Sequence, residues 1–338
     1  MQYRYIGKTG LRVSPICLGT MTFGTQCDKK EAFKIMDKAY EAGVNFFDTA
    51  EIYPVPPSGE LGGLTEEMVG EWLQGKPRDQ MIIATKVAGA ASGWFVPPTR
   101  HGMTAIDRHH ITKGIEGSLR RLKTDYIDLY QMHWPDTVVP IEESMEAFDR
   151  LVQEGKVRYL GTSNDTAYGT TKANMTAQVK GYKRFESIQN NFSLLNRRFL
   201  DEMKVMCERE NISLLPYSPM AGGVLSGKYN NAFGKDGRFR AYMSSNSPRV
   251  RAQATRFLNE KTLASTQEYI KIAEESGISP VTLATAWSKQ FSFVASTIIG
   301  ATTAVQLDES LKAMHLDLNE EVLKACDEVH SNILYPMG

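Results

Sequence analysis

The sequence predicts an α/β protein in which eight parallel strands and their helices form a (β/α)8 TIM barrel. Eight short apolar runs alternate along the chain with amphipathic helical patterns, and such alternation favours parallel strands joined by crossovers. No linker or shift in composition divides the 338 residues, so we expect a single domain over 1–338. The strand-like runs lie near 16–19, 44–47, 81–85, 127–132, 159–162, 187–190, 213–216 and 295–299.

The first predicted element is an N-terminal β-hairpin. Residues 3–16 alternate between apolar and polar side chains, and Lys8-Thr9-Gly10 is typical of a turn, so this segment suits a cap on the barrel. Between the apolar runs, segments such as 29–42 and 141–154 place their apolar residues on one helical face. These patterns predict helices that pack against the strands.

A doubly wound open sheet is the alternative fold. A G-x-G-x-x-G turn after the first strand would favour it, but residues 19–24 read GTMTFG and do not match. Three connections, at 54–64, 87–108 and 220–260, are longer than usual. We expect the long loops after strands three and seven to help build a site, since barrel active sites lie at the carboxyl ends of the strands.

Composition limits the classes of partner. Lys plus Arg and Asp plus Glu number 39 each, so no net field attracts nucleic acid or anionic lipid. The N-terminus lacks an apolar signal region and no apolar stretch nears the roughly 20 residues that span a bilayer. The four cysteines lack metal-ligand spacing. We therefore expect a cytoplasmic enzyme that binds small molecules and has no metal site; the oligomeric state cannot be read from the sequence.

The stretch 43–53, GVNFFDTAEIY, contains the first candidate site residues. Its apolar run predicts a buried strand, with Asp48 at the carboxyl end and Tyr53 in the loop beyond. A carboxylate at that depth is costly without a cationic partner. Lys86 follows the third apolar run and His133 follows the fourth, so all four side chains are expected at one rim of the barrel. Each alone has an ordinary explanation, as a solvated charge or a packing residue, but their combination favours a site.

These residues resemble the catalytic tetrad of the aldo-keto reductases, barrel enzymes that use a nicotinamide cofactor without a Rossmann fold. The resemblance rests on DTAEIY, IATKV and LYQMHWP around the four side chains. It continues through GLRVSPICLGTM near the start, VRYLGTSN at 157–164, LLPYSPMAGGVLSGKY at 214–229 and IIGATTAVQLDES at 298–310. The motifs cover nearly the whole chain in the expected order. Within the family the chain is most similar to bacterial NADP(H)-dependent reductases related to potassium-channel β subunits.

The resemblance implies a role for each member of the tetrad. Tyr53 would be the general acid that protonates a carbonyl oxygen as hydride reaches the carbon. An ordinary Tyr has a pKa of about 10, and we expect Lys86 to lower it. Asp48 would neutralise Lys86. Neutral His133 would orient the carbonyl and stabilise the charge that develops on its oxygen.

The same resemblance implies the residues that bind the cofactor. Ser163, Asn164 and Gln189 would hold the carboxamide, and Tyr217 would stack on the nicotinamide. Lys228 and Arg238 suit the pyrophosphate. The full set expected to bind NADPH is Thr20, Met21, Asp48, Ser163, Asn164, Gln189, Tyr217, Ser218, Pro219, Met220, Ala221, Gly222, Lys228, Arg238, Gly300, Thr302, Gln306, Glu309 and Ser310.

The chain departs from the family pattern at the adenosine end. Many members carry an Arg or Lys in the 300–306 stretch to pair with a 2′-phosphate, whereas this chain has GATTAVQ, and Ser310 replaces a common Asn. Hydroxyl and backbone donors can hold a phosphate, but less strongly than a charged fork. We predict NADPH rather than NADH, with use of NADH left open.

Aromatic residues suggest an apolar pocket for small carbonyl substrates without naming one. The residues expected to bind substrate are Phe23, Tyr53, Trp94, His133, Trp134 and Tyr335, with Met21 and Phe95 as further wall candidates. Two other functions stay open. The chain could be a cofactor-binding regulatory or redox-sensing subunit, like potassium-channel β subunits, or a barrel isomerase or lyase that uses Lys86 as a Schiff base.

Overall fold

Eight parallel strands form the central sheet of the computed structural model, which describes residues 2–93, 99–230 and 237–337. The strands are β3 (Ile16–Gly19), β4 (Phe46–Asp48), β5 (Ile82–Val87), β6 (Ile127–Met132), β7 (Val157–Ser163), β8 (Phe185–Gln189), β9 (Ser213–Leu214) and β10 (Thr297–Ile299). They pair in the order β10-β3-β4-β5-β6-β7-β8-β9. Hydrogen bonds from Ala295 N to Leu214 O and from Ile298 N to Pro216 O join the two edges, so the sheet closes into the predicted barrel.

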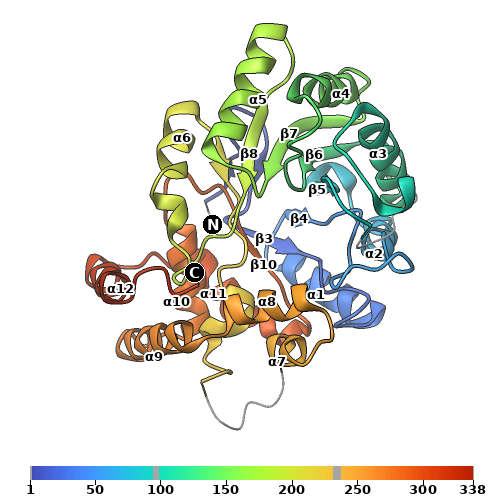
Figure 1. Cartoon of the computed structure of the whole chain (residues 1–338). Helices are drawn as coiled ribbons and strands as arrows, with labels where there is room; N and C mark the ends of the chain where they lie inside the picture. Colours follow the sequence, from blue (N-terminus) through green and yellow to red (C-terminus); the bar gives the residue numbers. More distant parts are fainter. Residues whose placement is uncertain (1, 94–98, 231–236, 338) are drawn as a thin grey trace.

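Helices surround the strands (Figure 1). Several begin where the sequence places a capping residue; the side chain of Asp28, for example, accepts a hydrogen bond from Glu31 N at the start of α1. The α-helices are α1 (Lys29–Glu41), α2 (Leu64–Leu73), α3 (Arg108–Leu122), α4 (Ile141–Gln153), α5 (Ala167–Lys180), α6 (Met203–Glu210), α7 (Arg238–Met243), α8 (Pro248–Phe257), α9 (Glu260–Glu275), α10 (Pro280–Lys289), α11 (Leu307–Lys312) and α12 (Glu320–Asn332). Short 3-10 helices lie at Arg78–Gln80, Arg100–Gly102, Arg198–Leu200, Ala221–Ser226, Ala304–Gln306 and Ala313–His315. None of the helices in the described part of the chain is long and apolar enough to cross a membrane.

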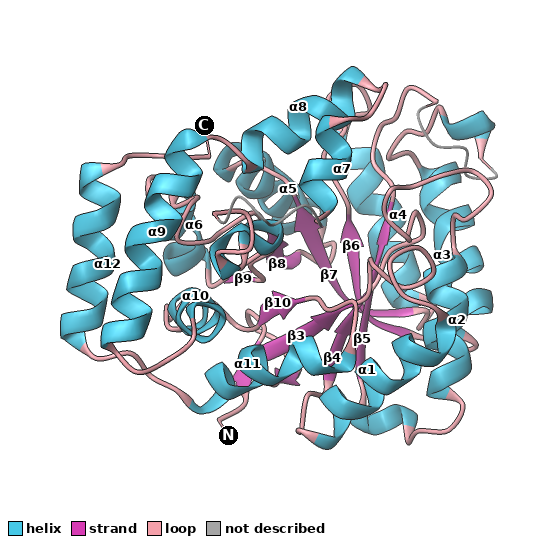
Figure 2. Cartoon of the chain, turned by 90° about the horizontal axis from the view of Figure 1, so that it is seen from below, coloured by secondary structure: helices cyan, strands magenta, loops and turns pink. Residues whose placement is uncertain are grey.

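The predicted hairpin is confirmed and closes one end of the barrel. Strands β1 (Arg4–Tyr5) and β2 (Arg12–Val13) pair antiparallel. Ile6 and Val13 pack in one buried cluster with barrel residues such as Phe46 and Leu129. Figure 2 shows the N-terminus at one end of the barrel and α7 and α8 at the other. The carboxyl ends of the strands are therefore left free for a site at the end opposite the hairpin.

Two predicted boundaries differ from the structure. β5 runs through Lys86 instead of ending before it, because Lys86 pairs in register with Gln131 of β6 and its charge is neutralised inside the barrel. The connection at 220–260 is not one long loop, since it contains a 3-10 helix and the helices α7 and α8. These helices are short and are separated by Gly-, Ser- and Asn-containing segments, so their periodicity was too brief to predict.

Candidate active site

Four side chains converge where β4, β5 and β6 end. Asp48 is the last residue of β4, Lys86 is the next-to-last residue of β5, and His133 directly follows β6. Tyr53 lies in the segment after β4, where its backbone N–H donates to Ala50 O. The predicted convergence is observed because neighbouring parallel strands keep their carboxyl ends at the same rim.

Lys86 is the centre of this cluster. Its side chain has no exposed surface, and its Nζ lies 2.5 Å from Asp48 Oδ2. The same nitrogen donates to Thr49 O at 2.7 Å and to Tyr53 Oη at 3.4 Å. Burial opposes the charge, but Asp48 and Tyr53 outweigh burial and raise the pKa of Lys86 above its ordinary value. A charged ammonium with all three protons in use is a poor nucleophile, which argues against a Schiff base.

Two glutamines hold the other oxygen of Asp48. Gln131 Nε2 and Gln189 Nε2 donate to Asp48 Oδ1 at 3.0 and 2.9 Å. Gln189 Nε2 also lies 3.2 Å from Gln131 Oε1. Sequence reasoning missed Gln131, although an amide so close to the carboxyl end of the strand that ends at Met132 was a signal for it. The carboxylate is thereby fixed by three donors from three different strands.

The pKa of Tyr53 corrects one expectation. Burial raises it above the ordinary value, and the neighbouring Lys86 offsets this only in part. The prediction that Lys86 lowers the pKa of Tyr53 below its ordinary value is therefore wrong for the protein without ligands. Loss of hydration disfavours the phenolate more than the Lys86 ammonium, which also pairs with Asp48, favours it. The phenol keeps its proton through the neutral range.

His133 sits beside the phenol as a neutral imidazole. The rings of His133 and Tyr53 meet edge to face with centroids 5.8 Å apart. Burial, with a smaller contribution from Lys86, holds the pKa of His133 well below its ordinary range. Its Nδ1 is buried without a hydrogen bond from the described residues. His133 can therefore act as a hydrogen-bonding group without carrying charge.

Several residues expected at the nicotinamide end lie together. Asn164 Nδ2 donates to His133 O at 2.8 Å, and Asn164 Oδ1 accepts a hydrogen bond from the Tyr217 hydroxyl. Ser163 Oγ donates to Gln189 O at 2.7 Å. Gln189 uses its amide nitrogen on Asp48. Thr20 donates to Asp48 O from both its amide and its hydroxyl, which joins β3 to the same rim.

Ser218, Gly222, Lys228 and Arg238 lie close together next to that end. Ser218 Oγ accepts from Gly222 N at 2.8 Å. A Cβ on Gly222 would lie 2.8 Å from an Arg238 guanidinium nitrogen, and one on Gly223 would lie 3.0 Å from Lys228 Nζ. Within the described residues neither cation makes an ion pair. Burial lowers the pKa of both, and mutual repulsion lowers that of Lys228 further, so the pair favours an anion. Pro219, Met220 and Ala221 belong to the same segment.

The expected adenosine residues follow β10. Gln306 Oε1 accepts from both the amide and the hydroxyl of Thr302, at 3.0 and 3.2 Å. Glu309 is bonded to Lys312 at 2.5 Å and to Thr282 Oγ1 at 3.0 Å. Gly300 is exposed and Ser310 is buried. Thr302 and Gln306 are thus available for a polar ligand, whereas Glu309 is directed toward α10 and α11.

The predicted substrate wall is brought together only in part. Trp134 and Met21 pack against the small cluster that contains Tyr53. Phe23 is fully buried in the hydrophobic core, so it lines no open pocket. The hydroxyl of Tyr335 is engaged by Asp201, with 3.0 Å to each of the two carboxylate oxygens. Trp94 and Phe95 lie outside the described residues.

The family model for the aldo/keto reductase family matches residues 15–331. The chain belongs to the aldo/keto reductase family. Members are oxidoreductases that generally bind nicotinamide cofactors.

The chain is 37% identical to Protein tas of Escherichia coli (strain K12), over 99% of both chains. It is 36% identical to the uncharacterized oxidoreductase YrpG of Bacillus subtilis (strain 168), over 97% of this chain and 96% of that relative. It is 34% identical to a probable voltage-gated potassium channel subunit beta of Oryza sativa subsp. japonica, over 93% and 91%.

Substitution of Asp48 by Asn tests the buried ion pair. The variant leaves the Lys86 ammonium buried without a counter-charge, so we expect the free energy of unfolding to fall by about 3–5 kcal/mol in urea denaturation. Asp308→Asn is the matched control, because Asp308 lies at the same 2.5 Å from Lys38 but its side chain is 50% exposed. In Asp308→Asn the free energy of unfolding should fall by about 1 kcal/mol or less. Equal losses of unfolding free energy in the two variants would contradict the assignment of Asp48 and Lys86 as a buried ion pair.

The depressed pKa of His133 predicts a dependence of stability on pH. Below about pH 6.5 the unfolded chain binds a proton that the folded chain does not, so this contribution is present above that pH and is lost as the pH falls. Between pH 7.5 and 5.5 it amounts to about 1.4 kcal/mol of unfolding free energy. Over the same pH interval, the unfolding free energy of the His133→Gln variant should fall by about 1.4 kcal/mol less than that of the wild type. Identical pH profiles would contradict the prediction.

Proposed function

We propose that this member of the aldo/keto reductase family reduces aldehyde or ketone carbonyls to alcohols with NADPH. The observation that carries the proposal is the contact of a buried, charged Lys86 with both Asp48 and the phenol of Tyr53. Such a phenol is a proton donor placed beside a fixed positive charge. The location at the carboxyl ends of barrel strands supports the same conclusion.

The cofactor would be held by residues already described. Lys228 and Arg238, two cations without ion pairs in the described chain, suit the pyrophosphate. Tyr217, half-buried after β9 and bonded to Asn164, suits a nicotinamide ring. When bound, the dinucleotide would supply a hydride. We propose the nicotinamide roles of Ser163 and Asn164 and the adenosine roles of Gly300, Thr302 and Gln306 on the same basis.

Proton delivery falls to Tyr53. As hydride adds to the carbonyl carbon and the C=O π bond breaks, its electron pair moves to oxygen, which takes the phenolic proton. The phenolate left behind is stabilised by Lys86 Nζ, 3.4 Å away in the protein as it stands. Asp48, held by Gln131 and Gln189, keeps that ammonium in position. The raised pKa of Tyr53 ensures that the proton is present before reaction.

Neutral His133 and the rim residues would position the substrate. An uncharged imidazole beside the phenol can donate a hydrogen bond to the carbonyl oxygen without competing for the proton. Met21 and Trp134 present apolar surface next to Tyr53. This lining favours hydrophobic aldehydes and ketones over charged ones.

Replacement of Tyr53 by Phe is the direct test. The variant keeps the ring but removes the acid, so kcat/KM for NADPH-dependent reduction of 4-nitrobenzaldehyde should fall by about 10²–10⁴. NADPH affinity, measured by fluorescence titration, should stay within about twofold. Tyr40→Phe, which removes only a hydroxyl 3.5 Å from Gln80 Oε1 at the surface, should leave the rate unchanged.

Two outcomes would overturn the proposal. Equal activity of Tyr53→Phe and wild type would remove Tyr53 as the acid. A wild-type protein that binds NADPH but does not oxidise it when any aldehyde or ketone is supplied would favour the alternative, a regulatory or redox-sensing subunit. The similarity to a probable potassium channel subunit beta is the observation that keeps this alternative in view.

Cofactor preference is a separate prediction. The amide and hydroxyl of Thr302 now donate to Gln306 Oε1, and a 2′-phosphate could replace that oxygen. A charge-assisted hydrogen bond of this kind contributes about 1.5–3 kcal/mol, so kcat/KM should be at least about tenfold higher with NADPH than with NADH. Thr302→Val should narrow the ratio, and a wild-type preference for NADH would contradict the prediction.

A further inference from the structure

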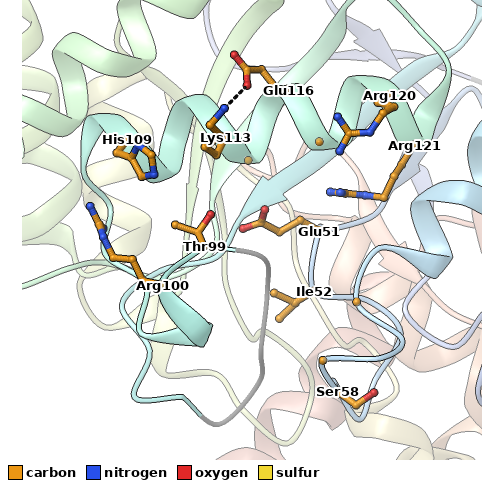
Figure 3. A pocket seen from close by; sticks show the side chains of 14 residues that line it. Glu51, Ile52, Ser58, Thr99, Arg100, His109, Lys113, Glu116, Arg120 and Arg121 are labelled. Carbon is orange, nitrogen blue, oxygen red and sulfur yellow. Dashed lines mark hydrogen bonds and ion pairs between the residues drawn. The ribbon is translucent and has the colours of Figure 1, made fainter.

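A cavity of about 390 Å³ with many charged side chains in its lining lies beside the segment that carries Tyr53 (Figure 3). Glu51 and Ile52, the two residues before Tyr53, form part of its wall, and α3 forms the opposite side. No member of the tetrad lines it. The lining residues are Glu51, Ile52, Ser58, Gly59, Gly62, Thr99, Arg100, His109, Lys113, Gly114, Glu116, Gly117, Arg120 and Arg121.

Most charges around the cavity are already paired. Arg100 lies 2.6 Å from Asp107, and Lys113 lies 3.2 Å from Glu116. Arg121 donates through Nε to Glu66 Oε2 at 2.7 Å. After these pairs are set aside, one carboxylate and one guanidinium of the lining lack an ionic partner of fixed charge among the described residues. They are Glu51 and Arg120.

Glu51 is at the inner end of the cavity. Its side chain is only 8% exposed. Oε1 accepts from Ala88 N at 2.6 Å and is 3.1 Å from His110 Nε2. Oε2 has no hydrogen bond from the described residues and lies 3.3 Å from where a Cβ on Gly114 would be. Oε2 therefore has free acceptor capacity toward the cavity, which a ligand with a donor group can use.

The positive charges of Arg120 and Arg121 are at the outer end of the cavity. Arg120 is exposed on α3, one residue from Arg121. The terminal nitrogens of Arg121 lie 2.7 and 3.3 Å from where a Cβ on Gly117 would be, and only its Nε is engaged by Glu66. Figure 3 shows both guanidinium groups on the same side of Glu51. Both guanidinium groups belong to the lining of the cavity, and a guanidinium edge suits a carboxylate or another planar anion.

We propose that this cavity binds a small zwitterion, with an ammonium group on Glu51 and an acidic group on Arg120 and Arg121. A simple anion would meet the Glu51 carboxylate at the inner end, and a simple cation would leave Arg120 without an anion and the terminal nitrogens of Arg121 without an acceptor. A molecule that carries both charges satisfies both ends of the cavity. Amino acids and short amino-carboxylic acids are the corresponding chemical class.

The cavity is distinct from the proposed carbonyl site but lies against it. Glu51 N donates to Lys86 O at 3.2 Å, and Ala88 N donates to Glu51 Oε1. Glu51 therefore ties the Tyr53 segment to the end of β5 on one side and faces the cavity on the other. The inference does not depend on catalysis, so it can be tested in the Tyr53→Phe protein as well as in the wild type.

Calorimetric titration of the full chain provides the test. The probes are glycine, 4-aminobutyrate and 6-aminohexanoate, with hexanoate and hexylamine as molecules that carry only one of the charges. We expect at least one amino acid to bind saturably, at least tenfold more tightly than hexanoate and hexylamine, in both the wild type and Tyr53→Phe. The length that binds best reports the separation of the two ends.

Variants locate the site. Arg120→Ala should weaken the best zwitterion at least fivefold, whereas Arg209→Ala, which removes an exposed arginine of α6 on another side of the barrel, should not. Glu51→Gln should abolish the advantage of the zwitterion over hexanoate. No saturable binding by any of the three zwitterions, an equal affinity for hexanoate, or an equal effect of the two arginine variants would overturn the proposal.

Discussion

The arrangement of the site depends on one buried charge, the ammonium of Lys86, and on the carboxylate that neutralises it. An uncompensated ammonium at this depth would cost several kcal/mol, so Asp48 must be present and correctly oriented for the barrel to keep Lys86. Gln131 and Gln189 provide that orientation from two further strands. The polar layer at the rim is therefore a set of mutually dependent contacts and not four independent residues.

The need to compensate buried charges also explains why apolar and polar side chains gather at opposite ends of the barrel. At the opposite end, the hairpin and apolar side chains such as Ile6 and Phe46 exclude water. Polar groups gather where the strands end and where segments from many parts of the chain can supply partners. Burial then acts on each titratable group according to its charge: it keeps Tyr53 protonated and His133 neutral, while Asp48 keeps Lys86 charged. This combination suits transfer of one proton to a carbonyl oxygen.

The segment after β4 has two faces with different chemistry. Tyr53 faces Lys86 and His133, while Glu51 faces the cavity beside α3. On the far side of the rim, Lys228 and Arg238 leave two cations for an anionic ligand. The short stretch around Tyr53 thus lies between a proposed cofactor and carbonyl site and a second polar site, and hydrogen bonds of Glu51 to both Lys86 and Ala88 join the two.

Local sequence determined the elements and the members of the tetrad. Apolar runs and amphipathic periods are short-range signals, so the strands, the hairpin and helices such as 29–42 were predictable, and the order of the motifs placed Asp48, Tyr53, Lys86 and His133 at one rim. Tertiary structure alone decided the rest. The burial of Phe23, the use of Gln131 and Gln189 on Asp48, the sign of the pKa shift at Tyr53, and the cavity at Glu51 depend on contacts between residues far apart in sequence. Solvation and long-range packing set those contacts, and neither can be read from a local pattern.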